Sequence, residues 1–279
     1  MKRAGAHFPD LAAWLRPRVV YSDLDGTLFG PGGSLYATAG GGITDAASGA
    51  VAALHRAGTA LVPVSGRAET QVREVARILG ADGFIAELGG ITARGDRIIH
   101  EYGAAYRGPG TPRQQMARSG AAALLLDTYA GRLEPHAPWA YADREVTMLF
   151  RGHLDLEEAR SVLAESGYRW LDLHDNGIIR RSFPSLDVKE IHAYHLVPVG
   201  VTKASAVEAD VAARGLGRSE AVAVGDSVSD AEVSPHVGAV FIVANGEDAL
   251  TGTDPADNVY LTDASNGEGF AEVVRGLLG

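Results

Sequence analysis

Two aspartates separated by one residue, Asp23 and Asp25, follow a short apolar run and precede a Gly-Thr pair. The run, residues 18–22, has the composition of a β-strand, and a parallel strand opens at its carboxyl end into the crevice where such sheets bind ligands. One carboxylate of such a pair can attack phosphorus as a nucleophile, while the other gives and later takes a proton. Together they also offer the hard oxygen ligands that Mg²⁺ prefers. Taken alone, the motif also fits an Asx-turn with solvated acids.

Three further motifs come directly after strand-like runs. Ser65 and Gly66 end one run and open a helix, where a hydroxyl and backbone N–H groups can bind an anion. Lys203 stands at a second strand-to-helix junction and can neutralise phosphate as a point charge. Asp226 and Asp230 follow the run AVAV, where they can ligate a metal ion or orient its ligands. Each motif also has an ordinary interpretation, namely a helix N-cap, a surface lysine and an acidic turn. Because the strand ends of one sheet converge, all of them can line a single crevice.

The elements that must position these motifs alternate between strand and helix at both ends of the chain. In the first part, strands are expected at 18–22, 59–64 and 83–87, and helices at 45–57 and 68–79. In the last part, strands are expected at 196–200, 221–225 and 241–244, and helices at 203–213 and 268–278. The alternation predicts an α/β fold with a doubly wound, Rossmann-like parallel sheet. Between the two ends the pattern changes to hairpins and helices, which predicts an inserted α+β cap domain. We therefore expect a discontinuous core at 1–87 and 196–279, and a cap at 88–195.

The ordered motifs resemble those of the haloacid dehalogenase-like phosphohydrolases, which carry DxDGT, then Ser or Thr, then Lys, then an acidic GDxxxD-type motif. The resemblance covers both core segments. It implies that Asp23 is the nucleophile and Asp25 the general acid/base of a phosphatase. It also implies a phosphate site made of Thr27, Ser65, Gly66 and Lys203. The Mg²⁺ site that it implies is made of Asp23, the main-chain oxygen of Asp25, Asp226 and Asp230.

The spacing of the motifs indicates which subgroup of the family the chain resembles. Asp25 and Ser65 are 40 residues apart, which leaves no room for a cap, whereas the 138 residues from Ser65 to Lys203 accommodate one. This arrangement, with the Val64–Arg67 run and the return into Lys203, is similar to that of Cof-type and sugar-phosphate phosphatases, whose large α/β cap lies in that gap. The resemblance implies a sugar or polyol phosphate as substrate. It also adds Asn245, in a late loop, as a phosphate-binding candidate.

The chain departs from the family pattern at two positions. Many relatives carry Asn just before the last acid, where this chain has Ser229, which changes the hydrogen bonds open to Asp230. In the same subgroup Gly often follows the motif lysine, and here that residue is Ala204.

Substrate specificity is expected on the cap, because the core motifs account only for phosphate and metal. Polar and aromatic cap residues that can meet a polyol or a second anion are His136, Trp139, Tyr141, Arg144, Arg180, Arg181 and His192. The site candidates among them are Arg144, Arg180, Arg181 and His192, although surface charge and packing also explain such residues. His192 and His195 are three residues apart in a strand-like run, so a metal-binding pair is not expected there.

Composition limits the partners. The formal net charge of -10 disfavours binding to nucleic acid or anionic lipid, so neither is expected as a partner. The same charge repels a phosphorylated small molecule, so a phosphate site must bring local positive charge. The chain has no cysteine, which excludes disulfides and Cys-based zinc sites and agrees with a cytoplasmic protein. No apolar run approaches the ~18 residues of a membrane span, and we expect a monomer or homodimer.

The sequence therefore predicts a Mg²⁺-dependent phosphatase that acts on a small phosphomonoester through an aspartyl phosphate on Asp23. A phosphomutase or phosphotransferase would form the same intermediate and pass its phosphoryl group to an alcohol. A non-catalytic phosphate-ligand binding protein would keep only the fold. A nucleotide-binding oxidoreductase is disfavoured, because no GxGxxG motif occupies a first strand–helix turn.

Overall fold

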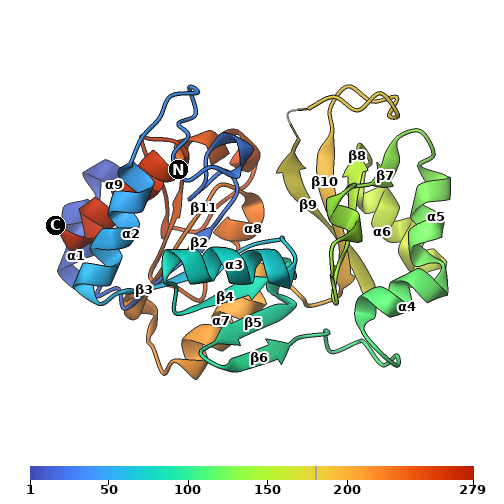
Figure 1. The fold of residues 1–279 in the computed structure, drawn as a ribbon, viewed down its shortest axis with the longest axis horizontal. Coiled ribbons are helices and arrows are strands. Elements are labelled where there is room, and N and C mark those ends of the chain that lie inside the picture. Colours follow the sequence, from blue (N-terminus) through green and yellow to red (C-terminus); the bar gives the residue numbers. More distant parts are fainter. Residues whose placement is uncertain (180) are drawn as a thin grey trace.

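The computed structural model describes residues 1–179 and 181–279; Arg180 and the side chain of Tyr141 lie outside the described part. The chain forms two sheets with helices packed on them, which Figure 1 shows as two lobes. The larger sheet has nine strands in the order β1-β13-β12-β11-β2-β3-β4-β5-β6. Its strands are β1 Lys2–Arg3, β2 Val19–Asp23, β3 Ala60–Val64, β4 Gly83–Ala86, β5 Ile91–Arg94, β6 Arg97–His100, β11 Ala221–Gly225, β12 Ala239–Ile242 and β13 Val259–Leu261. The helices of this lobe are α1 Phe8–Trp14, α2 Ala46–Ala57, α3 Glu69–Leu79, α7 Lys203–Ala213, α8 Val228–Ala231 and α9 Asn266–Leu278.

Helices cover both faces of this sheet. Neighbouring strands from β1 across to β4 all pair in parallel. Every residue of β2 and β11 is buried, which explains why both strands are unbroken apolar or small-residue runs in the sequence. Helices α1, α2, α3 and α9 pack on one face, and α7 with the α8 region packs on the other. The predicted doubly wound α/β core is therefore confirmed.

The smaller sheet has four strands in the order β7-β8-β10-β9, and all its pairs are antiparallel. Its strands and helices are β7 Leu133–Pro135, β8 Met148–Gly152, β9 Leu171–Ile178, β10 His192–Pro198, α4 Pro112–Ser119, α5 Ala121–Thr128 and α6 Leu156–Glu165. The helices bury Leu125 and Leu163 against Phe150, Leu173 and Tyr194 of the strands. This is the predicted α+β module, inserted between β6 and α7.

No described helix is both long enough and apolar enough to span a lipid bilayer.

Strand pairing differs from the boundaries that the sequence suggests at 88 and 195. The hairpin of β5 and β6, which the sequence assigns to the cap, pairs antiparallel with β4 and extends the nine-stranded sheet. Ile91 and Ala93 bury their side chains in the core of that sheet, which explains the pairing. At the other end, β10 continues to Pro198 between β8 and β9, so the strand expected to open the second core segment lies in the four-stranded sheet. Both domain boundaries depend on which strands pair with each other, and a local sequence pattern does not show the pairing.

Glu87 ties the two lobes together where β4 ends. Its fully buried carboxylate accepts hydrogen bonds from the backbone N–H groups of Glu145, Val146 and Thr147 at 2.9, 3.1 and 2.8 Å. The hydroxyl of Thr147 adds a fourth hydrogen bond at 2.9 Å. A carboxylate without contact with water is stable only when its oxygens are satisfied in this way. A core side chain therefore holds the segment of the cap that leads into β8.

Replacing Glu87 with Ala is expected to lower the free energy of unfolding by about 3–5 kcal/mol, because two buried N–H groups, one partly buried N–H group and the Thr147 hydroxyl lose their acceptor together. Urea denaturation followed by circular dichroism measures the change. Glu74→Ala is the matched control, since that glutamate lies on the surface and pairs with Arg77 one helical turn away, and little change is expected. Equal stability of the two variants would contradict the role given to Glu87.

Candidate active site

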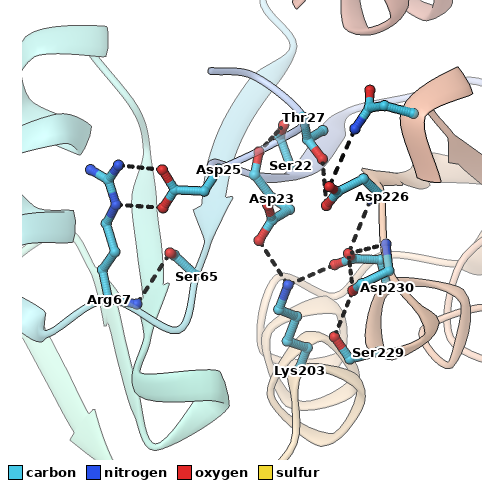
Figure 2. A network of polar contacts seen from close by, with 12 residues as sticks. Ser22, Asp23, Asp25, Thr27, Ser65, Arg67, Lys203, Asp226, Ser229 and Asp230 are labelled. Carbon is cyan, nitrogen blue, oxygen red and sulfur yellow. Dashed lines mark hydrogen bonds and ion pairs between the residues drawn. The ribbon is translucent and has the colours of Figure 1, made fainter. Parts of the chain in front are cut away.

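The carboxyl ends of three adjacent strands bring the sequence motifs together. Strand β2 lies between β3 and β11 and pairs in parallel with both, with Asp23 opposite Val64 of β3. Asp23 is the last residue of β2, Ser65 follows β3, and Asp226 follows β11. In Figure 2 their side chains gather at this edge, with Lys203 reaching in from α7.

The ammonium group of Lys203 joins two of the aspartates. Its Nζ lies 2.7 Å from Oδ1 of Asp23 and 2.9 Å from Oδ1 of Asp230, and its side chain is 2% exposed. Lys203 is the first residue of α7, and Thr202 caps this helix by accepting a hydrogen bond from the N–H of Ser205 at 3.0 Å. The cap fixes where α7 begins and so directs the lysine toward the end of β2.

The buried carboxylates outnumber the cation that faces them. Burial lowers the pKa of Lys203, but the adjacent Asp23 and Asp230 outweigh it and raise that pKa, so the lysine stays charged. Burial also raises the pKa of Asp23, against the opposing effect of Lys203 and with the support of Asp230 and Asp226. Burial and the charge of Asp230 raise the pKa of Asp226 to about 7. When ionised, these three neighbouring acids carry more negative charge than the single lysine can balance.

This donor set fits a divalent cation of the Mg²⁺ type. The carboxylates of Asp23 and Asp226 and the main-chain oxygen of Asp25 are hard oxygen ligands, which Mg²⁺ prefers. The loop approaches Asp226 closely: Gly26 has a φ of +86°, and a Cβ there would lie 2.1 Å from Oδ2 of Asp226. Only glycine allows the two motifs to come this near.

Thr27 and Asn245, predicted from the sequence as phosphate ligands, bond to protein groups around Asp226. The hydroxyl of Thr27 donates to Oδ1 of Asp226 at 3.3 Å. Nδ2 of Asn245 donates to the carbonyl of Gly26 at 2.9 Å and lies 3.4 Å from Oδ2 of Asp226. The N–H of Asn266 donates to Oδ1 of Asn245 at 2.8 Å, so both ends of this amide are engaged. These contacts hold the first and last motifs against each other.

Ser229 does not deprive Asp230 of hydrogen bonds. The hydroxyl of Ser227 donates to Oδ2 of Asp230 at 2.6 Å, and the N–H groups of Asp226 and Ser227 donate to the same oxygen at 3.2 and 3.1 Å. The Oγ atoms of Ser229 and Ser227 are 2.9 Å apart. The serine that replaces the usual asparagine therefore supports Asp230 through a second serine.

Asp25 turns away from Asp23 in Figure 2 and pairs with Arg67. Nε and Nη2 of Arg67 lie 2.7 and 2.5 Å from Oδ2 and Oδ1 of Asp25, a two-point charge-assisted contact. The N–H of Arg67 also donates to Oγ of Ser65 at 3.2 Å. The sequence analysis gave Arg67 no role. The signal was its place two residues after Ser65, where a basic side chain can face the same crevice.

One of the predicted cap residues reaches the core motifs. Arg144 is 6% exposed, and its Nη1 donates to the carbonyl of Gly66 at 3.0 Å and to the hydroxyl of Thr147 at 2.9 Å. His195 is buried against the same glycine, since a Cβ on Gly66 would lie 2.9 Å from its Nε2. Burial and then the charge of Arg144 lower the pKa of His195, which keeps its ring neutral. The sequence analysis did not select His195 as a site residue, because nothing local shows which face of β10 meets the core.

Two other site candidates on the cap, Arg181 and His192, contact cap side chains. The guanidinium of Arg181 stacks over the ring of Phe183 at 5.5 Å. His192 and Tyr194 are stacked on one face of β10, whereas His195 points to the opposite face, as strand alternation requires. Arg180 lies outside the described residues.

Comparisons with known proteins agree with this geometry. No family model matches the chain. The phosphoglycolate phosphatase of Methanoculleus marisnigri is 29% identical over 238 residues, which cover 84% of this chain and 88% of the relative. The sucrose-phosphatase of Synechocystis sp. PCC6803 superposes with a TM-score of 0.68 at 16% identity, covering 94% of this chain and 98% of that one. A haloacid dehalogenase-like hydrolase from Bacteroides thetaiotaomicron gives a TM-score of 0.62 at 17% identity, covering 93% and 99%.

This chain has the fold of the haloacid dehalogenase-like hydrolases. The family resemblance inferred from the four motifs is confirmed, and so is the class of enzyme, a hydrolase of phosphoric monoesters. In this hydrolase the acids, the serine and the lysine converge at one sheet edge, while Arg144 brings the cap to the Gly66 turn.

Lys203→Met is expected to destabilise this hydrolase by about 3–5 kcal/mol, because Asp23 and Asp230 would stay buried without their counter-ion. Equilibrium unfolding in urea, in the presence of a chelator, measures the difference from the wild type. Lys189→Met, an identical change at an exposed position, should have little effect. A fully stable Lys203 variant would show that the two carboxylates do not depend on the lysine.

Proposed function

We propose that this hydrolase is a Mg²⁺-dependent phosphatase that releases phosphate from a small phosphomonoester through an aspartyl phosphate on Asp23. The observation that carries the proposal is the position of the Asp23 carboxylate, which ends β2 and lies 2.7 Å from the ammonium group of Lys203. A carboxylate at this crevice can attack phosphorus while the ammonium group balances the charge on the phosphoryl oxygens.

Two transfers account for turnover. In the first, an oxygen of Asp23 bonds to phosphorus, the bond from phosphorus to the ester oxygen breaks, and Asp25 protonates the departing alcohol. In the second, Asp25 takes a proton from water, which attacks phosphorus and frees both Asp23 and inorganic phosphate. Asp25 must leave Arg67 for either proton transfer, so we expect substrate binding to separate this pair.

Mg²⁺ would be held by the carboxylates of Asp23 and Asp226 and the main-chain oxygen of Asp25, with Asp230 supporting the site from behind. The ion supplies charge neutralisation at the phosphate oxygens when it is bound. The protein groups proposed to hold the phosphate are the hydroxyl of Ser65, the N–H of Gly66 and the ammonium group of Lys203.

The environment of Arg144 favours a substrate with a second anionic group. The hydrogen bonds of its buried guanidinium go to neutral oxygens of Gly66, Thr147 and Trp139, and no described carboxylate lies within 4.0 Å of it. A buried cation without a direct counter-ion, next to the phosphate-binding turn, suits a carboxylate a few bonds away from the phosphate. The relative from Methanoculleus marisnigri is named for phosphoglycolate, a substrate of that kind. We therefore place a short phosphorylated hydroxy acid first, and a sugar or polyol phosphate, suggested by the sequence motifs, second.

Asp23→Asn should reduce phosphate release at least about 10³-fold, because an amide oxygen is a poor nucleophile toward phosphorus. Release of inorganic phosphate from p-nitrophenyl phosphate in the presence of Mg²⁺ measures the loss, and circular dichroism checks the fold. Asp96→Asn makes the same chemical change in the exposed β5–β6 turn and should retain activity. Near-normal turnover by the Asp23 variant would contradict the proposed aspartyl-phosphate intermediate.

A substrate panel assayed with excess Mg²⁺ and again after chelation should separate the candidate functions. We expect Mg²⁺-dependent release of phosphate, fastest from 2-phosphoglycolate or a related acid and slower from sugar and polyol phosphates. Transfer of phosphate to an added sugar acceptor would instead indicate a phosphotransferase. Binding without release would indicate a sensor. Arg144→Lys should raise KM for the carboxylated substrate several-fold but leave KM for p-nitrophenyl phosphate near the wild-type value, because the latter has no second anion.

A further inference from the structure

A second group of ligand-type side chains lies on the cap, away from the proposed phosphate site. One ligand atom from each of His153, Glu190 and His192 can be chosen so that all three lie within 4.8 Å of one another. His153 follows β8, while Glu190 and His192 lie at the start of β10. The two segments are adjacent because Gly152 pairs with His192 across the β8–β10 ladder.

This group belongs to the helix-covered face of the cap sheet. His192 stacks with Tyr194, which is buried among the cap helices, whereas His195 on the other face meets Gly66 of the core. The same three side chains line a pocket of about 460 Å³ together with the first turn of α6. The group is therefore separate from the acids at the end of β2.

The positions come near those of a three-ligand transition-metal site. Ligands of a tetrahedral Zn²⁺ lie about 2.0–2.2 Å from the ion, so neighbouring ligand atoms are about 3.3 Å apart. Oε1 of Glu190 and Nε2 of His192 are already 3.0 Å apart. His153 lies within the 4.8 Å limit and can reach this separation by a movement of about 1–2 Å.

A carboxylate behind one histidine matches the way in which proteins orient metal-binding imidazoles. Nδ1 of His192 lies 2.7 Å from Oδ2 of Asp175, within ion-pair distance although not aligned as a hydrogen bond, and the other ring nitrogen, Nε2, faces Glu190 at 3.0 Å. Nδ1 of His153 is buried and has no hydrogen-bond partner among the described residues, an unmet need that a ligand can satisfy. Nε2 of His192 contacts only Glu190, itself a member of the group, so a metal ion could take the place of that contact.

We propose that His153, Glu190 and His192 bind a divalent transition metal of the Zn²⁺ class, with Asp175 orienting His192 and a fourth position open to water. Two imidazole nitrogens and one carboxylate form a set that Zn²⁺ uses and Mg²⁺ avoids, whereas the acids around Asp226 offer oxygen alone. The ion would join the end of β8 to the start of β10.

Zinc titration of the full-length, chelator-treated protein by isothermal calorimetry tests this proposal. Excess Mg²⁺ and the Asp226→Asn substitution keep Zn²⁺ out of the oxygen site. We expect one Zn²⁺ per chain and a rise in the thermal unfolding midpoint on binding. His153→Asn should abolish stoichiometric binding, and Asp175→Asn should weaken it by about 10–100-fold, since residues that orient a metal-binding imidazole have effects of this size.

His174→Asn is the matched control, because this cap histidine lies on β9 next to Asp172 and outside the group. It should bind Zn²⁺ like its parent. In an otherwise wild-type chain, His153→Asn should keep Mg²⁺-dependent phosphatase activity, so failure of this proposal is distinguishable from failure of the proposed function. No stoichiometric Zn²⁺ binding by the folded parent, or unchanged binding by the His153 variant, would overturn the proposal.

Discussion

The buried ion contact of Lys203 with Asp23 and Asp230 is the interaction on which the rest of the site depends. An ammonium group and two carboxylates removed from water are stable only while they face one another, so the contact fixes how α7 sits against the ends of β2 and β11. The third acid, Asp226, is held by Thr27, by Asn245 and by the close approach of Gly26. Negative charge remains in excess, and this is the physical basis for the proposed divalent cation and phosphate site.

The overall charge of -10 would repel a phosphate, so a phosphate site needs positive side chains close by. Lys203 and Arg67 supply positive charge from the core, and Arg144 supplies it from the cap. All three are at least partly withdrawn from water, where each charge acts at short range and is weakly screened by salt. The field that a bound phosphate would meet is therefore set by these few groups and not by the net charge of the surface.

The same network that joins the lobes also positions the cap residue Arg144, which contacts the Gly66 turn. Glu87 accepts from the backbone of residues 145–147 and from the hydroxyl of Thr147, which in turn accepts from Arg144. Arg144 then reaches the carbonyl of Gly66. A change in how the lobes meet would therefore move the group proposed to select the substrate. These contacts therefore link stability at the junction to the proposed substrate specificity.

The sequence by itself determined the type of core and the members of the core site, because those depend on local patterns. Apolar runs ending in Asp23, Ser65 and Asp226 identify parallel strands whose carboxyl ends converge, and Lys203 at a helix start completes the set. Tertiary structure alone decided what depends on contacts between distant segments. Only pairing with β4 shows that β5 and β6 extend the core sheet, and only the packed structure shows that Asp25 faces Arg67 and that Asn245 bonds to protein groups. The cap was the part that local patterns predicted least, since Arg144 and His192 are both polar cap residues, and only the packed structure shows that Arg144 contacts Gly66 of the core while His192 stacks on Tyr194 within the cap.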